Sequence, residues 1–243
     1  TPLFGWWIER EERIEEALRE INLFDWYFFI NSSCVEEGLK RGRFNVSLLH
    51  HSVDPLVWHP VDAEKKYDWS FVGGWSAKRQ EVIERALKVS VNAALYGPRW
   101  GKRCRFSSPI RRILKGDYIE GDPLLRLYSE TRVVLNITNW GFGEGEKRSG
   151  MNMRVLEVPA CGAFLLTDGS RDMSAMVRPG EHGAVYEGLE DFEEKLGYYL
   201  KNHSEREKIA TAGRERVSKN YTYDHVTCII AQRYASLMAM APV

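Results

Sequence analysis

The chain has 243 residues, of which 44% are hydrophobic and 12% aromatic, enough for one large core or two smaller ones. Its 34 basic and 34 acidic residues give a formal net charge of zero. This balance excludes an overall field that would attract nucleic acid or an anionic bilayer, so any anionic ligand must be met by a local cluster. No apolar run approaches the ~20 residues of a membrane-spanning helix.

The four cysteines are widely separated and form no C-x-x-C pair. We expect four free thiols, a reducing compartment and no structural zinc. The first residues carry neither a basic leader nor a cleavage site. We therefore expect a cytoplasmic protein without a transmembrane segment. Because the chain starts without Met, in an apolar stretch typical of a strand, we also expect it to be part of a longer protein.

The first part of the chain alternates apolar runs with amphipathic spacing. Ile14, Leu18 and Ile21 lie at helical spacing, and the apolar runs on either side are short enough for buried strands. A polar stretch with Pro60 then predicts a domain boundary, with residues 1–62 as the remnant of an α/β domain and its hinge. The expected strands of this part are 3–8, 25–30 and 46–50, and the expected helices are 9–21 and 34–41.

Residues 63–243 continue the alternation at greater length. Strands that alternate with helices of ten or more residues predict an α/β fold, a Rossmann-like parallel sheet with helices on both faces. The partial α/β domain would precede this sheet. The expected strands are 69–72, 92–96, 117–120, 133–137, 163–167 and 183–186, and the expected helices include 78–89, 122–128, 191–202, 204–220 and 224–239.

In an open parallel sheet, ligands bind beyond the carboxyl ends of the strands. Gly73 and Gly74 follow a predicted strand, and Lys78 and Arg79 follow them. Glycines let a backbone approach phosphate, and a helix N-terminus offers free N–H groups. We interpret this turn as a diphosphate site, with an ordinary turn and two solvated charges as the alternative. Other residues at strand ends are also candidates for the cleft: Tyr96, Tyr118, Ile119, Asn136 and Asn139.

A second candidate lies in "SGMNMRVLEVPACGAFLLTDG", residues 149–169. Arg154 and Glu157 share one face of a helix that begins at a glycine-rich loop, 141–150. A guanidinium there can fork onto phosphate oxygens, and a carboxylate can accept both hydrogen bonds of a ribose diol. The alternative is a surface ion pair, which would contribute little stability. Asn152 is suited to cap this helix or to contact the ligand.

Two further features have an ordinary and a functional interpretation. The segment 99–115 holds seven basic residues and no acid, which indicates either a solvated face or a surface for an anionic group. His50 and His51, at a strand end beside the boundary, are either a structural pair or contacts to a sugar or phosphate. They are the only catalytic candidates. The sequence has no D-x-D motif and no His/Asp cluster, so we predict no metal and no cofactor.

Several segments follow one another in a familiar order: "FVGG…KR", "ALYGP", "YSETRVVLNI", "GMNMRVLEVPACGAFLLTD" and "YTYD". Over about residues 68–235, the series resembles the C-terminal domain of GT-B glycosyltransferases of the group-1, family-4-like type, in the branch of CgeB-like spore-maturation proteins. Residues 1–60 resemble the end of the N-terminal domain of such enzymes. The resemblance implies binding of a nucleotide diphosphate sugar, with an acceptor that the sequence does not identify.

The resemblance also implies roles for single residues. Glu157 matches the ribose-binding Glu of the family's E-x7-E motif, but the first acid of that motif falls on Ser149, with Glu144 and Glu146 out of register. The backbone of Tyr118 and Ile119 would meet the base. The donor diphosphate would be bound by Gly73, Gly74, Lys78, Arg79, Gly150, Met151, Asn152 and Arg154.

We therefore expect transfer of a sugar from a nucleotide diphosphate to an acceptor. The departing phosphates gain negative charge in the transition state, and fixed Lys, Arg and helix N–H groups would stabilise them without a metal. One alternative is a non-catalytic nucleotide-sugar-binding or assembly module, which Ser149 favours. Another is a GT-B nucleotide-sugar epimerase whose acid and base lie on a missing domain. A NAD-dependent enzyme is the weakest alternative, because the G-x-G-x-x-G fingerprint is absent.

Overall fold

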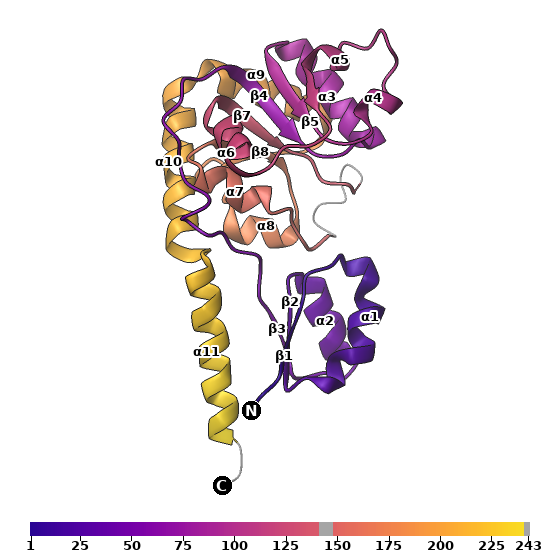
Figure 1. Ribbon diagram of the computed structural model, residues 1–243, viewed down its shortest axis with the longest axis vertical. Helices are drawn as coiled ribbons and strands as arrows, with labels where there is room; N and C mark the ends of the chain where they lie inside the picture. The colour runs from indigo at the N-terminus through magenta and orange to yellow at the C-terminus, as the bar shows by residue number, and fades with distance from the viewer. Residues whose placement is uncertain (141–147, 241–243) are drawn as a thin grey trace.

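The computed structural model describes residues 1–140 and 148–240, which form two α/β units with separate parallel sheets (Figure 1). The first unit is built on a three-stranded sheet in the order β1-β2-β3. Its strands pair in parallel, with Tyr27 of β2 opposite both Gly5 and Val46. These strands are β1 (Phe4–Trp7), β2 (Trp26–Phe29) and β3 (Val46–Leu48).

Helices α1 (Ile14–Glu20) and α2 (Ser32–Lys40) cover one face of this first sheet, with short 3-10 turns at Glu11–Arg13 and Ile21–Leu23. The predicted helix over 9–21 begins late. Arg10 has extended backbone angles, φ −65° and ψ 151°, so Glu9 and Arg10 stay in a loop at the carboxyl end of β1. This late start leaves their side chains outside the helix.

The long helix α11 (Tyr223–Met240) covers the other face of the first sheet (Figure 1). Its Val226 and Ile230 pack against Phe28 and its neighbours, and Arg233 lies 3.6 Å above the Trp26 ring. The sequence analysis assigned this helix to the domain of residues 63–243, whereas in the structure the helix packs against the sheet of the first unit. The reason is that β2 points large aromatic side chains to both faces, and the second face also has to be buried.

The second unit is built on a six-stranded sheet in the order β6-β5-β4-β7-β8-β9, parallel throughout. This arrangement confirms the predicted Rossmann-like class. The chain runs outward from β4 in one direction and from β7 in the other, so the strand order reverses between them. Its strands are β4 (Tyr67–Val72), β5 (Ala93–Tyr96), β6 (Leu114–Gly116), β7 (Thr131–Asn136), β8 (Phe164–Asp168) and β9 (Ala184–Tyr186).

Helices cover both faces of the second sheet because its strands are apolar on both sides. Phe71 and Leu135 lie in the cluster that includes side chains of α3 and α9, and Val134 and Leu165 lie in the cluster with α7 and α8. The helix α8 was not predicted. The helices of this unit are α3 (Ala77–Val89), α4 (Trp100–Arg103), α5 (Ile110–Ile113), α6 (Gly121–Ser129), α7 (Arg154–Ala160), α8 (Arg171–Met176), α9 (Gly188–Lys201) and α10 (His203–Asn220).

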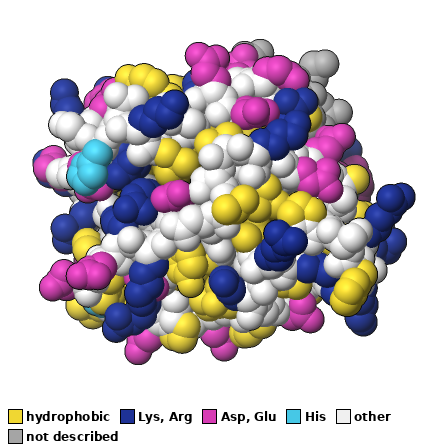
Figure 2. Space-filling model, turned by 90° about the horizontal axis from the view of Figure 1, so that it is seen from above, with side chains coloured by type: hydrophobic (Ala, Val, Ile, Leu, Met, Phe, Trp, Pro, Cys, Tyr) yellow, Lys and Arg dark blue, Asp and Glu magenta, His cyan; other side chains and the backbone are white. Residues whose placement is uncertain are grey.

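Positive and negative side chains are interspersed on the face that Figure 2 shows, in keeping with the zero net charge. Three cysteines are buried, Cys228 is exposed, and all four are free thiols. Within residues 1–140 and 148–240, no helix is both long enough and apolar enough to cross a membrane.

Candidate functional site

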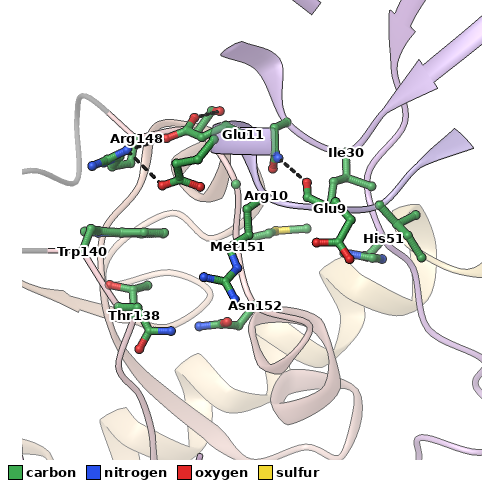
Figure 3. Close-up of a pocket in the computed structure, with 16 residues that line it drawn as sticks. Glu9, Arg10, Glu11, Ile30, His51, Thr138, Trp140, Arg148, Met151 and Asn152 are labelled. Atoms are coloured by element: carbon green, nitrogen blue, oxygen red, sulfur yellow. Dashed lines mark hydrogen bonds and ion pairs between the residues drawn. The ribbon is translucent and has the colours of Figure 1, made fainter. Parts of the chain in front are cut away.

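A cleft of about 400 Å³ opens between the two units, beyond the carboxyl ends of β1 and β7 (Figure 3). This is the edge of the second sheet at which its strand order reverses, the usual ligand position in such folds. The first unit supplies one wall and the second unit the other. The lining residues of the first unit are Ile8–Glu12, Ile30, Asn31 and His51, and those of the second are Thr138, Asn139, Trp140 and Arg148–Asn152.

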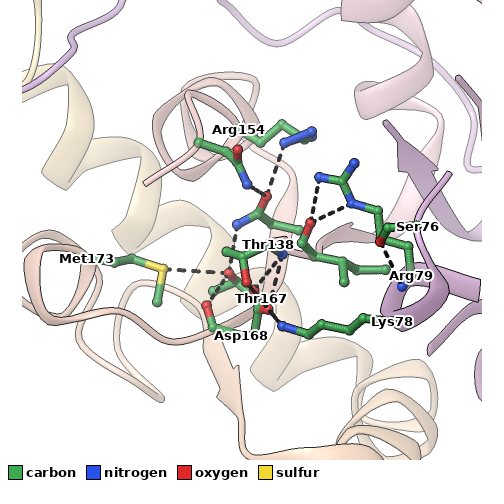
Figure 4. A network of polar contacts seen from close by, with 11 residues as sticks. Ser76, Lys78, Arg79, Thr138, Arg154, Thr167, Asp168 and Met173 are labelled. Atoms are coloured by element: carbon green, nitrogen blue, oxygen red, sulfur yellow. Dashed lines mark hydrogen bonds and ion pairs between the residues drawn. The ribbon is translucent and has the colours of Figure 1, made fainter. Parts of the chain in front are cut away.

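Beneath the second unit's wall, Asn136 of β7 bonds the loop before α7, α7 itself and Thr167 of β8, in the polar network around Arg154 and Thr167 that Figure 4 shows. It is fully buried, and its Oδ1 accepts hydrogen bonds from Asn152 Nδ2 at 3.0 Å and Arg154 Nη1 at 3.2 Å. Arg154 Nε also donates to the carbonyl oxygen of Val72 at 2.9 Å. Asn152 therefore does not cap α7, whose N-cap is Met153. Arg154 is tied to β4 and β7 rather than paired with Glu157.

Lys78 and Arg79 both bind protein groups at the ends of β7 and β8. Lys78 Nζ lies 2.5 Å from Asp168 Oδ2, and both side chains are about nine-tenths buried. Asp168 also accepts from the backbone N–H of Thr138 at 3.0 Å. Arg79 donates to the carbonyl oxygens of Ile137 and Gly74, and burial lowers its pKa to about 10. Their role as diphosphate ligands stays a prediction, and neither is among the residues that line this cleft.

The Gly73–Gly74 turn packs against the loop that follows β5. The N–H of Gly73 donates to the Tyr96 carbonyl at 2.8 Å. Gly97 has a φ of +145°, and a Cβ there would lie 2.1 Å from the Gly73 oxygen. The glycines thus allow two loops to approach each other closely. Tyr96 lies half-buried against Gly116, outside the lining of the cleft.

The predicted base-binding pair is also placed away from this cleft. The predicted strand over 117–120 is wrong, since β6 ends at Gly116, whose carbonyl accepts from Gly97. Tyr118 follows in a loop, is 73% exposed and bonds Glu120. In the basic segment 99–115, Arg111 bonds backbone carbonyls. The remaining basic side chains of the segment are exposed: Arg99, Lys102, Arg103, Arg105, Arg112 and Lys115.

Glu157 lies in the first turn of α7, half-buried, just below the second wall. Burial raises the pKa of its carboxyl to about 7, and the nearby Arg154 only partly opposes this effect. Within the described part of the chain, its side chain makes no hydrogen bond or ion pair. A carboxyl with a strongly raised pKa is typical of functional sites, but Glu157 is not among the residues that line this cleft. Its predicted contact to a ribose stays a prediction.

The structure separates the two candidate histidines. Nδ1 of His50 donates to the Ile30 carbonyl oxygen at 2.9 Å, and His50 is not among the residues that line this cleft, so its catalytic role stays a prediction. His51 lines the cleft, and burial together with the neighbouring His50 lowers its pKa. His51 is therefore uncharged at neutral pH and faces the site.

The sequence analysis missed the wall that the first unit supplies. Glu11 Oε2 accepts from Ser33 Oγ at 2.6 Å and Ser149 Oγ at 2.8 Å, and its Oε1 accepts from Arg148 at 3.1 Å. Burial raises the pKa of Glu11, but these hydrogen bonds outweigh it and the net pKa is lowered. At position 149, where the resemblance implies an acid, the first unit thus contributes a carboxylate. The signal was a run of five successive charged residues after a strand, 9–13, which the helical spacing obscured.

Asp172 of α8 joins the two units from the other side. Its carboxylate accepts from the backbone N–H of Ser32 at 2.8 Å and of Gly150 at 3.1 Å. Gly150 has a φ of +88°, and a Cβ there would lie 2.6 Å from Asn31 Oδ1. The loop before α7 therefore touches the first unit where only glycine fits.

The predicted glycine-rich loop falls largely on residues 141–147, with Glu144 and Glu146, and these lie outside the described residues. Among the described ones, no group of three or more His, Cys, Asp or Glu side chains could hold a metal ion. The absence of a metal and of a cofactor from the reaction stays a prediction.

Known proteins resemble both the sequence and the fold. A family model described as glycosyl transferase-like matches residues 78–232. Spore protein CgeB of Bacillus subtilis (strain 168) is 22% identical over 240 residues, which cover 93% of this chain and 73% of CgeB.

Among solved structures, HepE from Anabaena in complex with UDP superposes with a TM-score of 0.77 at 12% identity, over 97% of this chain and 72% of that chain. Sucrose-phosphate synthase from Thermosynechococcus elongatus gives a TM-score of 0.69 at 14% identity, over 96% of this chain and 63% of that chain. These structural likenesses concern the fold, whereas the family model covers more than half of the sequence. The chain therefore belongs to the glycosyl transferase-like family, and its fold is that of GT-B glycosyltransferases.

Proposed function

We propose that the chain transfers a sugar from a nucleotide diphosphate donor to an acceptor, with the donor in the cleft between the two units. The observation that carries the proposal is the position of the cleft, at the edge where the strand order of the second sheet reverses. Family membership supports it. The structure of HepE with UDP-glucose makes UDP-glucose the first donor to try.

The nucleoside would lie over the second unit. Glu157 would accept the two hydroxyl hydrogens of the ribose, one on each carboxylate oxygen, an arrangement that the ionised form favours because it is acceptor-only. The fixed network of Asn136, Asn152 and Arg154 would position the diphosphate at the start of α7. Lys78 and Asp168 would hold the end of β8 against β7 and keep that wall rigid.

In the reaction, the bond between the anomeric carbon and the phosphate oxygen breaks, and the acceptor oxygen forms a new bond to that carbon. The proton of the acceptor hydroxyl must leave, and the diphosphate departs with the bonding electrons. His51 is uncharged at neutral pH because burial lowers its pKa, so it can accept this proton. The diphosphate would be stabilised by cations and N–H groups of the cleft, without a metal.

A screen of nucleotide sugars tests the proposal. The wild-type chain should be stabilised against heat by at least one of UDP-glucose, UDP-N-acetylglucosamine, GDP-mannose or their free nucleoside diphosphates. Slow hydrolysis of the bound donor, followed as release of the nucleoside diphosphate, would show bond cleavage without knowledge of the acceptor. Absence of binding by any of them at millimolar concentration would contradict the proposal.

A second candidate is a binding or assembly module that keeps the pocket but transfers nothing. The observation in its favour is Ser149, whose hydroxyl stands where the resemblance implies a carboxylic acid. This side chain is 2% exposed and donates to Glu11. Such a module would bind the nucleotide sugar and release no product. Cleavage that His51→Ala abolishes without loss of binding would favour the enzyme.

A further inference from the structure

The three cationic side chains that the sequence analysis assigned to the diphosphate donate most of their hydrogen bonds to oxygen atoms of the protein. Arg154 donates to Val72 and Asn136, Arg79 donates to backbone carbonyls, and Lys78 pairs with Asp168. An incoming diphosphate carries about two to three negative charges, and burying them next to groups that are already neutralised would be costly. A cation that is not already engaged is therefore needed close to the cleft.

Arg10, on the opposite wall, meets this requirement. Figure 3 shows its side chain extending across the cleft towards Asn152. Within residues 1–140 and 148–240, its guanidinium makes no hydrogen bond and no ion pair, and the side chain is exposed. An unpaired guanidinium is suited to a phosphate group, because its planar fork donates two parallel hydrogen bonds.

The carboxylates beside Arg10 are engaged elsewhere. Glu9 lies 3.1 Å from Arg13, Glu12 lies 3.3 Å from Arg148, and Glu11 is held by Ser33 and Ser149. The backbone on both sides of Arg10 is also fixed, since the Glu9 carbonyl accepts from Asn31 and the Arg10 carbonyl accepts from Arg13. The loop thus holds Arg10 in place without neutralising it.

We propose that Arg10 binds the diphosphate of the donor from the first unit, so that the anion site is shared by both units. This inference rests on the proposed function, because it takes a nucleoside diphosphate as the ligand. The N–H groups of Asn152 and Arg154 that do not bond Asn136 or Val72 would contact the diphosphate on one side, and the guanidinium of Arg10 on the other. A bound diphosphate would then join the two units across the cleft, and its binding would stabilise their contact.

Calorimetry with UDP, GDP, ADP, CDP and dTDP, and with the corresponding nucleosides, tests this assignment. Arg10→Ala should lower the affinity for the preferred diphosphate tenfold to a hundredfold and leave that for its nucleoside within twofold. Arg10→Lys should recover part of the loss, since it keeps the charge but not the fork. Arg19→Ala, which removes an exposed cation of the same unit from α1, should change nothing.

The outcomes separate this inference from the proposed function. Equal affinity of wild type and Arg10→Ala for the diphosphate, with equal melting temperatures, would overturn the role of Arg10 and leave the proposed function intact. Equal losses for the diphosphate and its nucleoside would also overturn it, because Arg10 would then act on the shape of the cleft. Wild-type protein that binds none of the five diphosphates would reject the proposed function together with the inference.

Discussion

The two walls of the cleft use charge in opposite ways. On the second unit, Lys78, Arg79 and Arg154 bind carbonyls and carboxamide or carboxylate oxygens, and they fix three strand ends. On the first unit, Arg10 projects from a loop with no partner in the described chain. A cation near a glycine turn can therefore hold a wall in position without binding the ligand. Only the hydrogen-bond and ion-pair partners of the side chain distinguish these two roles.

The strongest way to break the second wall is to remove the partner of Lys78. Asp168→Ala leaves a buried ammonium without its carboxylate and the N–H of Thr138 without an acceptor. Loss of one member of a buried pair typically costs about 3–5 kcal/mol of unfolding free energy. Urea unfolding measures the effect. The exposed Asp122 provides the control, because Asp122→Ala should stay within about 0.5 kcal/mol of wild type.

Arg154→Ala should affect binding and stability together. We expect a tenfold to hundredfold loss of affinity for a nucleoside diphosphate, about 1.5–3 kcal/mol for a charged hydrogen bond. The melting temperature should fall as well, because Val72 loses its donor. Calorimetry and thermal unfolding give the two values. Arg112→Ala, on the exposed basic segment, should change neither, and weaker binding by that variant would assign the segment to the donor site.

The pattern of apolar residues was sufficient to predict the second sheet, because parallel strands buried on both faces are continuous apolar runs. It could not place α11, since a helix with apolar residues near its start does not show which sheet it will cover. It also failed at Arg10, where the helical spacing of Ile14, Leu18 and Ile21 suggested a helix from residue 9. The helical turns begin at Glu11 and α1 at Ile14, two and five residues after the predicted start. Local capping decides such shifts, and here the shift decided which charge faces the cleft.

Glu157→Gln should raise the stability of the chain at high pH and weaken its binding of the nucleotide. The pKa of Glu157 is about 7 in the folded chain and 4.5 in the unfolded one. The wild type therefore loses stability as the pH rises from about 4.5 to 7, and the loss is complete above that range. At pH 8, Glu157→Gln should be more stable by about 1–3 kcal/mol, with little difference at pH 4.5.

The same substitution should weaken binding of the nucleotide, because an amide offers one neutral acceptor oxygen and an NH2 donor where the carboxylate offers two charged acceptor oxygens. Wild-type affinity should rise with pH through about 7 as Glu157 ionises, and the affinity of Glu157→Gln should lack this step. Calorimetry between pH 5.5 and 8.5 follows both. An identical pH dependence in the two proteins would place the ribose elsewhere.

The smallest expected change in unfolding free energy concerns the contact between Glu11 of the first unit and Ser149 of the second. Ser149→Glu would put a second carboxylate beside Glu11, 2.8 Å from the present hydroxyl, and like-charge repulsion should cost about 1–2 kcal/mol. The double variant Glu11→Ser with Ser149→Glu moves the acid from one wall to the other and should recover most of that cost, since Ser33 and Arg148 remain as donors. A double-mutant cycle by urea unfolding gives the coupling. Additive effects would show that Glu11 and Ser149 are independent, and recovery would show that one carboxylate position is shared by the two units.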